Sequence, residues 1–368
     1  MAKCINCGRE SKLISKTLEL CLGCIRNDFE KVLPHIKEVH SKTKKRFGLP
    51  SAPPKDPKGV KCDFCVNECQ IPEEETGYCG LRRNVGNKLL GGGIKDGNLS
   101  WYYDNLPTNC VADWVCAGGT KAGYPEFSFS KDAEYGYKNL AVFYQACSFN
   151  CLFCQNWHYR NEIRSPINIT SSDLANCVDK KTSCICYFGG DPAPQIIHSL
   201  ETSNLALKKN KERILRICWE TNGSMNRKYL KKMAELSLKS GGCIKFDLKA
   251  YDEKLNIALC GVTNKRTLEN FKILSDFIKK RPDPPFLVAS TLLIPGYVDK
   301  NEVSKIAEFI VSLNPEIPYS LLAFYPCFYM MDLPTTSRAH VKECKETAES
   351  FGLSNVKIGN IHLLSDDY

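Results

Sequence analysis

The stretch Leu140-Ala-Val-Phe-Tyr-Gln-Ala-Cys-Ser-Phe-Asn-Cys-Leu-Phe-Cys154 places three cysteines directly after a short apolar run. Cys147, Cys151 and Cys154 follow the spacing Cys-x3-Cys-x2-Cys, and the aromatic Phe153 precedes the last of them. Three thiolates can hold three irons of a cubic [4Fe–4S] cluster. The run has no fourth cysteine, so it predicts a cluster with one iron open to a ligand. A catalyst needs such an open iron, whereas an electron carrier does not.

The chain around and after this stretch alternates short apolar segments with amphipathic ones. Alternation of this kind is typical of a parallel sheet with right-handed crossovers. Six repeats are too few to close an eight-stranded barrel, so we expect an α/β fold with a partial, TIM-like (β/α)6 barrel. Strands are predicted at 140–144, 184–188, 214–219, 243–246, 287–294, 320–324 and 356–358, and helices for example at 227–239, 267–280, 300–313 and 339–351.

Polar residues or glycines follow almost every predicted strand. In a parallel barrel the active site is built from the residues that follow the strands. The first strand precedes the three cysteines, and later strands precede Gly189-Gly-Asp191, Glu220-Thr-Asn222 and Asp247-Leu-Lys249. We therefore expect a ring of polar groups around one cluster.

Together these motifs resemble the radical S-adenosylmethionine (SAM) superfamily, whose signature is Cys-x3-Cys-x2-Cys with an aromatic residue before the last cysteine. The resemblance implies that Cys147, Cys151 and Cys154 are catalytic, that they bind a [4Fe–4S] cluster, and that SAM chelates the open iron. It implies reductive cleavage of SAM to a 5′-deoxyadenosyl radical, which abstracts hydrogen from a substrate while the protein orients and shields the chemistry. For these cysteines alone, a zinc site or redox thiols are the alternative.

Within the superfamily the match is most similar to relatives of the pyruvate formate-lyase activating enzyme. It covers residues 140–368 and extends weakly back to Cys62. The motifs that carry it are Cys154-Gln-Asn-Trp157, Trp219-Glu-Thr-Asn-Gly223, Phe246-Asp-Leu-Lys249 and Ile358-Gly-Asn-Ile-His362. The resemblance implies a protein substrate, as in glycyl-radical activation, and a reductant of the ferredoxin or flavodoxin type.

The resemblance also implies roles for the residues after the strands. The bare backbone of Gly189 and Gly190 would contact the methionyl amino group, because only glycine lets a main chain approach so closely. Asp191 stands where the family usually has glutamate. The residues with implied cofactor-binding roles are Phe153, Gly189, Gly190, Asp191, Glu220, Thr221, Asn222, Asp247 and Lys249.

Two alternatives stay open for the acidic residues of this set. The run Glu220-Thr221-Asn222 would bind the ribose of SAM, or a monovalent cation together with Asp247. Lys249 would lie near the carboxylate of the cofactor, where a point cation is useful. A buried ion pair of Glu220 or Asp247 with Lys249 is the structural alternative.

The N-terminus carries two Cys-x2-Cys knuckles, Cys4–Cys7 and Cys21–Cys24. Their pairing predicts a closed, structural zinc site. A helix is expected within 27–47, so we assign residues 1–47 to zinc-ribbon-like knuckles plus a helix. Residues 48–60 are rich in proline and predict a stiff linker before the next segment.

A second cysteine-rich module is predicted at 61–138, and the barrel at 139–368. The module carries Cys62, Cys65, Cys69 and Cys79, which could bind an auxiliary iron–sulfur cluster, bind zinc, or stay unligated. Cys110 and Cys116 would complete that site or form a redox pair. Cysteines on the apolar strands are predicted to be small buried hydrophobic residues; they include Cys184, Cys186, Cys218 and Cys243.

The composition of the 368 residues limits the classes of protein. There is no apolar run long enough to cross a membrane and no secretory signal, so we expect a cytoplasmic protein without a membrane partner. Its 21 cysteines then indicate metal or redox chemistry and suit an anaerobic cell. The net charge of +9 is mild, so a solvated surface is favoured over an RNA contact.

The sequence therefore predicts a radical SAM enzyme, an oxidoreductase similar to the pyruvate formate-lyase activating enzyme. The long N-terminal extension favours a macromolecular substrate, and a protein is favoured over RNA. Radical modification of RNA or of a small metabolite is the alternative within the same chemistry. A non-catalytic iron–sulfur electron carrier or scaffold is the alternative outside it, and it would have no affinity for SAM.

Overall fold

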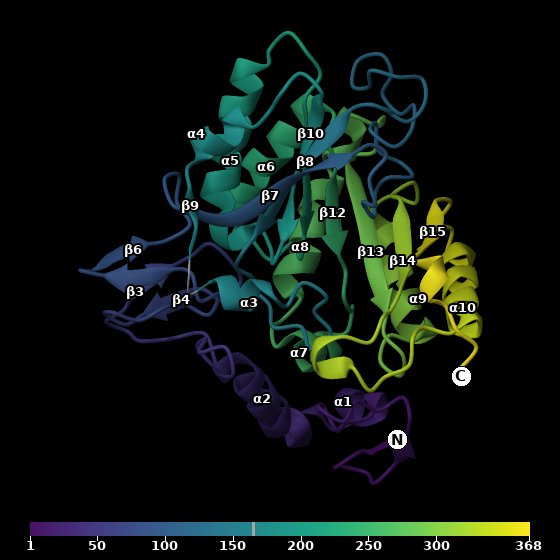
Figure 1. Ribbon diagram of the computed structural model, residues 1–368. Helices are drawn as coiled ribbons and strands as arrows, with labels where there is room; N and C mark the ends of the chain where they lie inside the picture. The colour runs from purple at the N-terminus through teal and green to yellow at the C-terminus, as the bar shows by residue number, and fades with distance from the viewer. Residues whose placement is uncertain (164–165) are drawn as a thin grey trace.

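The computed structural model describes residues 1–163 and 166–368, and one nine-stranded sheet dominates this part of the chain. Its strands are β7 (Gly97–Asn105), β8 (Lys138–Tyr144), β9 (Asn168–Ile169), β10 (Thr182–Gly189), β11 (Arg216–Thr221), β12 (Ile244–Asp247), β13 (Leu287–Leu293), β14 (Tyr319–Ala323) and β15 (Val356–Gly359). The order across the sheet is β15-β14-β13-β12-β11-β10-β8-β7-β9, and neighbours from β15 to β8 run parallel. This open, mainly parallel sheet confirms the predicted partial barrel (Figure 1).

Helices that connect the parallel strands lie along the outer face of the sheet (Figure 1). They include α4 (Ser171–Asn176), α5 (Ile196–Lys209), α6 (Arg227–Ser240), α7 (Glu253–Cys260), α8 (Lys265–Ser275), α9 (Lys300–Leu313) and α10 (Arg338–Ser350). Side chains of Asn226, Asp299 and Ser337 accept backbone hydrogen bonds at the starts of α6, α9 and α10. The helix predicted at 267–280 is divided: α8 ends at Ser275 and a 3₁₀ turn follows at Ile278–Lys280. Other 3₁₀ turns are Ala193–Gln195, Phe328–Met330 and Ile361–Leu363.

Strand β7 comes from the range that we assigned to the cysteine-rich module, yet it extends the barrel sheet. It pairs antiparallel with β8, from Leu99 opposite Tyr144 to Asn105 opposite Lys138. The sequence analysis did not predict this strand. The reason is that Trp101, Tyr102 and Tyr103 are consecutive aromatic residues, which hides the alternation of a half-buried strand.

Residues 106–137, which we call the floor, close the end of the barrel at which the parallel strands begin. Glu134 of the floor forms a 2.6 Å ion pair with Arg216 at the start of β11, and both side chains are buried. Trp114 Nε1 donates to Ser320 Oγ of β14 at 3.1 Å. In Figure 1 the floor forms the loops beyond the tails of the strand arrows.

The N-terminal extension lies at the opposite end, where the parallel strands end (Figure 1). It contains β1 (Ala2–Lys3), β2 (Glu10–Ser11), α1 (Leu22–Asn27) and α2 (Phe29–Lys45), followed by the hairpins β3 (Val60–Cys62)–β4 (Cys69–Ile71) and β5 (Arg83–Val85)–β6 (Lys88–Leu90). Helix α2 is the helix predicted within 27–47, and its buried face includes Val32, Ile36 and Val39.

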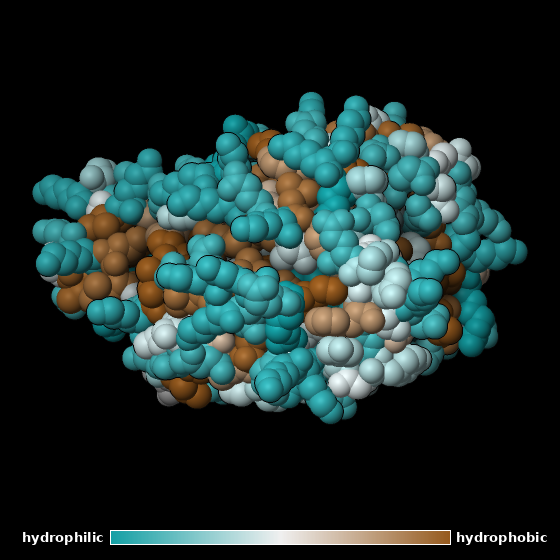
Figure 2. Space-filling model, turned by 90° about the horizontal axis from the view of Figure 1, so that it is seen from above, coloured by the Kyte–Doolittle hydropathy of each residue, from teal (hydrophilic) through white to brown (hydrophobic). Residues whose placement is uncertain are grey.

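The surface seen from the floor side is mostly hydrophilic. Figure 2 shows hydrophobic side chains gathered mainly toward the end of the molecule that carries β3–β6 in Figure 1. None of the helices within residues 1–163 and 166–368 is long and apolar enough to cross a membrane.

Candidate active site

The loop that carries Cys147, Cys151 and Cys154, here called the cluster loop, begins after β8 and ends at α3 (Tyr159–Glu162). Two of its backbone amides are held by the end of α7. Asn150 N donates to Cys260 O at 2.8 Å, and Leu152 N donates to Leu259 O at 3.0 Å. The barrel therefore holds the backbone of this loop in place.

The side chain of Asn150 also ties the cluster loop to α2 of the N-terminal extension. Its Nδ2 lies 2.9 Å from both His40 Nδ1 and Thr43 Oγ1, and its Oδ1 accepts from Arg160 at 2.7 Å. Burial lowers the pKa of His40 to about 4, so the imidazole is neutral and Nδ1 can accept this bond. The extension thus takes part in positioning the three cysteines.

The three cysteines and all nine predicted cofactor-binding residues line one cavity at the ends of the strands. The nine are Phe153 from the cluster loop, Gly189, Gly190 and Asp191 at the end of β10, Glu220, Thr221 and Asn222 at the end of β11, and Asp247 and Lys249 at the end of β12. Asn222 Nδ2 lies 3.8 Å from Cys147 Sγ. The structure brings the predicted residues together, and their roles as ligands remain a prediction.

Gly189 and Gly190 are required by the packing of the chain itself. Gly189 has φ +106°, and a Cβ there would lie 2.5 Å from Tyr144 N. A Cβ on Gly190 would lie 2.3 Å from Ala146 O. The two glycines therefore let the end of β10 press against the start of the cluster loop.

The carboxylate of Asp191 accepts hydrogen bonds from three donors within the protein. Its carboxylate accepts from Asn222 N at 2.7 Å, from Thr221 Oγ1 at 3.0 Å and from Ala193 N at 2.8 Å. Burial raises the pKa of Asp191 to about 6, against these hydrogen bonds, which favour the charged form. The aspartate that replaces the usual glutamate thus joins the β10 loop to the β11 loop.

A lysine that the sequence analysis did not single out lies between the two acidic residues of the cavity. Lys245 Nζ is 3.0 Å from Glu220 and 2.6 Å from Asp247, and Lys249 Nζ is 3.1 Å from Asp247. Burial acts to raise the pKa of Asp247, but the two ammonium groups outweigh burial and hold that pKa well below its usual range. Lys245 therefore supplies a positive charge where we had placed a monovalent cation, and the predicted ion pair of Asp247 with Lys249 is also present.

A further cysteine lies next to the cluster loop. A hydrogen bond from the Cys260 thiol lowers the pKa of Cys151 to about 7. Cys260 is fully buried at the end of α7. It belongs to no motif, so the sequence alone contained no signal for its position.

The four cysteines of the second group lie beside the cluster loop. Cys62, Cys65, Cys69 and Cys79 are all buried. Asn67 Nδ2 lies 3.7 Å from Cys65 Sγ and donates to Ser148 O of the cluster loop at 2.7 Å. This contact joins the cysteine-rich module to the candidate active site.

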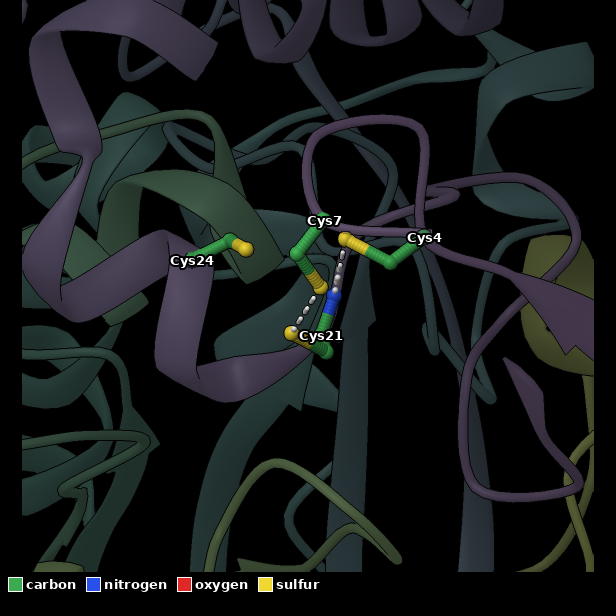
Figure 3. A group of neighbouring side chains, drawn as sticks. All are labelled: Cys4, Cys7, Cys21 and Cys24. Atoms are coloured by element: carbon green, nitrogen blue, oxygen red, sulfur yellow. Dashed lines mark hydrogen bonds between the residues drawn. The ribbon is translucent and has the colours of Figure 1, made fainter. Parts of the chain in front are cut away.

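The two N-terminal knuckles meet in space. The sulfurs of Cys4, Cys7, Cys21 and Cys24 all lie within 4.8 Å of one another (Figure 3). Cys7 Sγ is 3.7 Å from Cys21 Sγ, and the amide of Cys21 lies 3.4 Å from Cys4 Sγ. Four converging thiols fit the tetrahedral, all-sulfur coordination of a structural zinc ion.

Cys110 and Cys116 do not complete the site of the second cysteine group, whereas a redox pair stays a prediction. Both line a cavity inside the barrel together with Cys184, Cys186, Cys218 and Cys243, and not a site with the second cysteine group. Both cysteines belong to the floor, which folds back against the inside of the barrel. The spacing of the cysteines in the sequence does not predict this long-range contact.

Fold and cavity together define an α/β barrel protein with a cysteine-lined cavity at the ends of its strands. Residues 141–310 match the family described as the radical SAM superfamily. The chain is 30% identical over 212 residues to a putative glycyl-radical enzyme activating enzyme of Methanocaldococcus jannaschii, covering 57% of this chain and 76% of that protein. The chain therefore belongs to the radical SAM superfamily.

Other comparisons are more distant. An uncharacterized protein of Methanocaldococcus jannaschii is 23% identical over 314 residues, with 83% of each chain covered. A solved domain of pyruvate-formate lyase-activating enzyme from Bacteroides vulgatus is 20% identical, with a TM-score of 0.38 and coverage of 48% of this chain and 98% of that one. Streptococcus suis SuiB bound to S-adenosylmethionine is 15% identical, with a TM-score of 0.40 and coverage of 59% of this chain and 49% of that one.

Proposed function

We propose that this chain cleaves SAM reductively and abstracts a hydrogen atom from a protein substrate. One observation carries the proposal: the three cysteines share a single cavity with the residues that end β10, β11 and β12. A thiol site for zinc alone would not need this ring of glycine, carboxylate and lysine groups.

The residues present fit a [4Fe–4S] cluster with SAM on its open iron. Bound there, the cluster and SAM would supply one-electron reductive cleavage of the C5′–S bond, with the electron from a ferredoxin- or flavodoxin-type reductant and methionine as the leaving group, and hydrogen abstraction from the substrate. Cys147, Cys151 and Cys154 would hold the cluster. Lys249 would pair with the carboxylate of SAM.

Anaerobic reconstitution with iron and sulfide tests this chemistry. With SAM and a reductant, the protein should form 5′-deoxyadenosine, and Cys151→Ala should lower the rate at least about 100-fold, because each ligand of the cluster is needed to keep its geometry. Cys177→Ser, at the end of α4, is the matched control and should keep the rate. Equal rates in wild type and Cys151→Ala would refute the assignment.

A protein is the substrate class that we favour. The name of the Methanocaldococcus jannaschii relative, a putative glycyl-radical enzyme activating enzyme, supports it. A deuterated candidate glycyl-radical protein from the same cell should transfer deuterium to 5′-deoxyadenosine. Transfer from deuterated RNA or from a small-molecule extract, with none from protein, would overturn this choice.

The second cysteine group would hold an auxiliary iron–sulfur cluster. Lys44 and Arg82 are buried next to it, and no carboxylate within the described residues lies within 4.0 Å of either cation. Lys44 Nζ donates to Tyr78 O at 2.5 Å, and Tyr78 N lies 3.4 Å from Cys69 Sγ. Burial lowers the pKa of Lys44 to about 7, whereas the Arg82 guanidinium stays charged and needs a compensating anion, which a thiolate-ligated cluster would supply.

The N-terminal knuckles would hold a structural zinc ion, and metal analysis separates the two N-terminal sites. Cys4→Ser/Cys7→Ser should lose about one zinc per chain and keep its iron, since four sulfurs bind one zinc in such sites. Cys62→Ser/Cys65→Ser should lose about four irons and keep its zinc. The reverse pattern would exchange the two assignments.

A further inference from the structure

Six cysteines line a cavity inside the barrel, between the candidate active site and the floor. They are Cys110 and Cys116 of the floor, Cys184 and Cys186 of β10, Cys218 of β11, and Cys243 just before β12. Glu220 and Lys245 line both this cavity and the candidate active site. We call this second cavity the lumen site.

Strand register explains why the cysteines of the sheet face the lumen. Cys186 of β10 is paired with Cys218 of β11, and Glu220 of β11 is paired with Lys245 of β12. Side chains two residues apart on a strand point to the same face, so Cys218 shares a face with Glu220, and Cys243 shares one with Lys245. Since Glu220 and Lys245 face the candidate active site, the cysteines face inward as well.

The spacing of sulfurs on a sheet suits a multi-iron cluster better than a single ion. Neighbouring strands lie about 4.8 Å apart, and alternate residues along one strand lie about 6.7 Å apart. A single zinc with bonds of about 2.3 Å would need its sulfurs about 4 Å apart. Among the described residues, only the N-terminal knuckles bring three or more metal-ligating atoms within 4.8 Å of one another.

A buried cation beside the lumen site has no carboxylate partner. Arg281 is 6% exposed and donates to the carbonyl oxygens of Pro284 and Gly242, while its Nε has no hydrogen-bond partner. No carboxylate in residues 1–163 and 166–368 lies within 4.0 Å of its guanidinium. Cys243 and Cys218 interact electrostatically with this guanidinium, and so do Asp283 and Glu126 from beyond 4.0 Å. An anionic, thiolate-held cluster would compensate this charge.

The walls of the lumen site are mainly apolar, and three charged side chains reach it. Cys110 Sγ lies 3.2 Å from Glu220 Oε1, and Arg216 and Lys245 line the same cavity. Ala112, Val115 and Val288 form an apolar part of the wall around Cys110, Cys116, Cys218 and Cys243. We propose that the lumen site binds a further iron–sulfur cluster, held by cysteines of the floor and of β10, β11 and β12.

Iron and sulfide analysis of the reconstituted full chain tests this proposal. Cys110→Ser/Cys116→Ser should lose about two to four irons and as many sulfides per chain relative to wild type, depending on the type of cluster. Cys177→Ser/Cys344→Ser changes two cysteines outside the lumen and should lose neither. Unchanged iron in the floor variant, or a loss of zinc without sulfide, would overturn the proposal. Formation of 5′-deoxyadenosine reports separately on the candidate active site.

A measurement on the wild-type protein removes any dependence on how the variants fold. Cys110 and Cys116 are partly exposed, but burial raises the pKa of both thiols, so iodoacetamide at alkaline pH should alkylate them only after a chelator has removed iron. Cys177 is also partly exposed and should be alkylated before and after chelation. Equal alkylation of Cys110 and Cys116 in the iron-loaded and iron-free protein would contradict a cluster in the lumen.

Discussion

At the scale of single residues, Lys245 alters the cofactor site that the sequence predicts. The motif residues Glu220 and Asp247 are ordinary candidates for binding a cation, and the structure places a lysine ammonium between them. In the sequence, its position two residues before Asp247 indicates only that the two side chains share a face of the strand. The lysine belongs to no motif, and only the register of β11 with β12 brings it between the two carboxylates.

The first prediction concerns this lysine. Wild-type cleavage of SAM should be independent of sodium or potassium, because Lys245 and Lys249 together already neutralise Glu220 and Asp247. Lys245→Met should lower the free energy of unfolding by about 3 kcal/mol, as expected when one partner of a buried ion pair is removed. Potassium should restore part of the activity of this variant. An absolute requirement of the wild-type protein for a monovalent cation would contradict this role of Lys245.

The second prediction compares two glycines with similar backbone angles. Gly189 has φ +106° and Gly352 has φ +100°, but a Cβ would clash with Tyr144 only at Gly189, and it meets nothing at Gly352. Gly352→Ala should cost about 1 kcal/mol of unfolding free energy from backbone strain alone. Gly189→Ala should lower the free energy of unfolding by clearly more than Gly352→Ala does. It should also reduce the iron content, because it moves the cluster loop. Equal losses of unfolding free energy for the two variants in denaturant titrations would show that the close packing of Gly189 against Tyr144 does not affect stability.

At the scale of elements, α2 is part of the candidate active site although it lies far away in sequence. Asn150 of the cluster loop is fully buried and bonds to His40 and Thr43 of α2. The periodicity of 27–47 predicted this helix, and the seven predicted strands, which correspond to β8 and β10–β15, begin and end within two residues of the observed bounds. It did not predict that α2 supports the cluster loop, because this contact depends on a long-range fold-back of the extension.

The third prediction follows from that contact. Asn150→Ala should lower the free energy of unfolding by about 2–3 kcal/mol, since it leaves buried donors and acceptors without partners. It should also speed the loss of iron from the reconstituted protein. Asn210→Ala, which removes a bond to Ala206 O and a bond from Arg213 at the end of α5, is the control and should keep its iron. Equal rates of iron release from both variants would show that α2 does not hold the cluster loop.

The fourth prediction is the pH dependence of the same contact. The pKa of His40 is depressed to about 4 in the fold, against about 6.5 in an unfolded chain. The unfolded state therefore binds more protons between these values, so stability should fall as pH decreases from 6.5 toward 4, by at most about 1.4 kcal/mol per pH unit from this group. His40→Gln should flatten this slope in thermal unfolding scans. A variant with the full wild-type slope would show that another group titrates.

At the scale of the whole molecule, buried charge accompanies the buried cysteines. Lys44, Arg82, Arg160 and Arg281 are buried, and no carboxylate in the described chain lies within 4.0 Å of their charged groups. Each lies near one of the three cysteine groups of the barrel and module. The sequence showed the cysteine motifs but not these cations, because their partners come from distant segments.

The fifth prediction follows from this arrangement. Removing iron with a chelator should lower the temperature of unfolding, since it leaves buried cations without compensating anions. Arg82→Met should reduce the difference in unfolding temperature between the iron-loaded and iron-free protein. An exposed change, Arg338→Met, should leave this difference unchanged. Identical unfolding temperatures with and without iron would contradict a structural role for the clusters.

The most direct test of the central claim is the electron paramagnetic resonance spectrum of the reduced, reconstituted protein with and without SAM. SAM should shift one component of the spectrum, because it binds the open iron of the cluster at Cys147, Cys151 and Cys154. That component should disappear in Cys151→Ala and persist in Cys177→Ser. A spectrum that SAM does not change, or a SAM-dependent component that survives in Cys151→Ala, would contradict the assignment of this cavity.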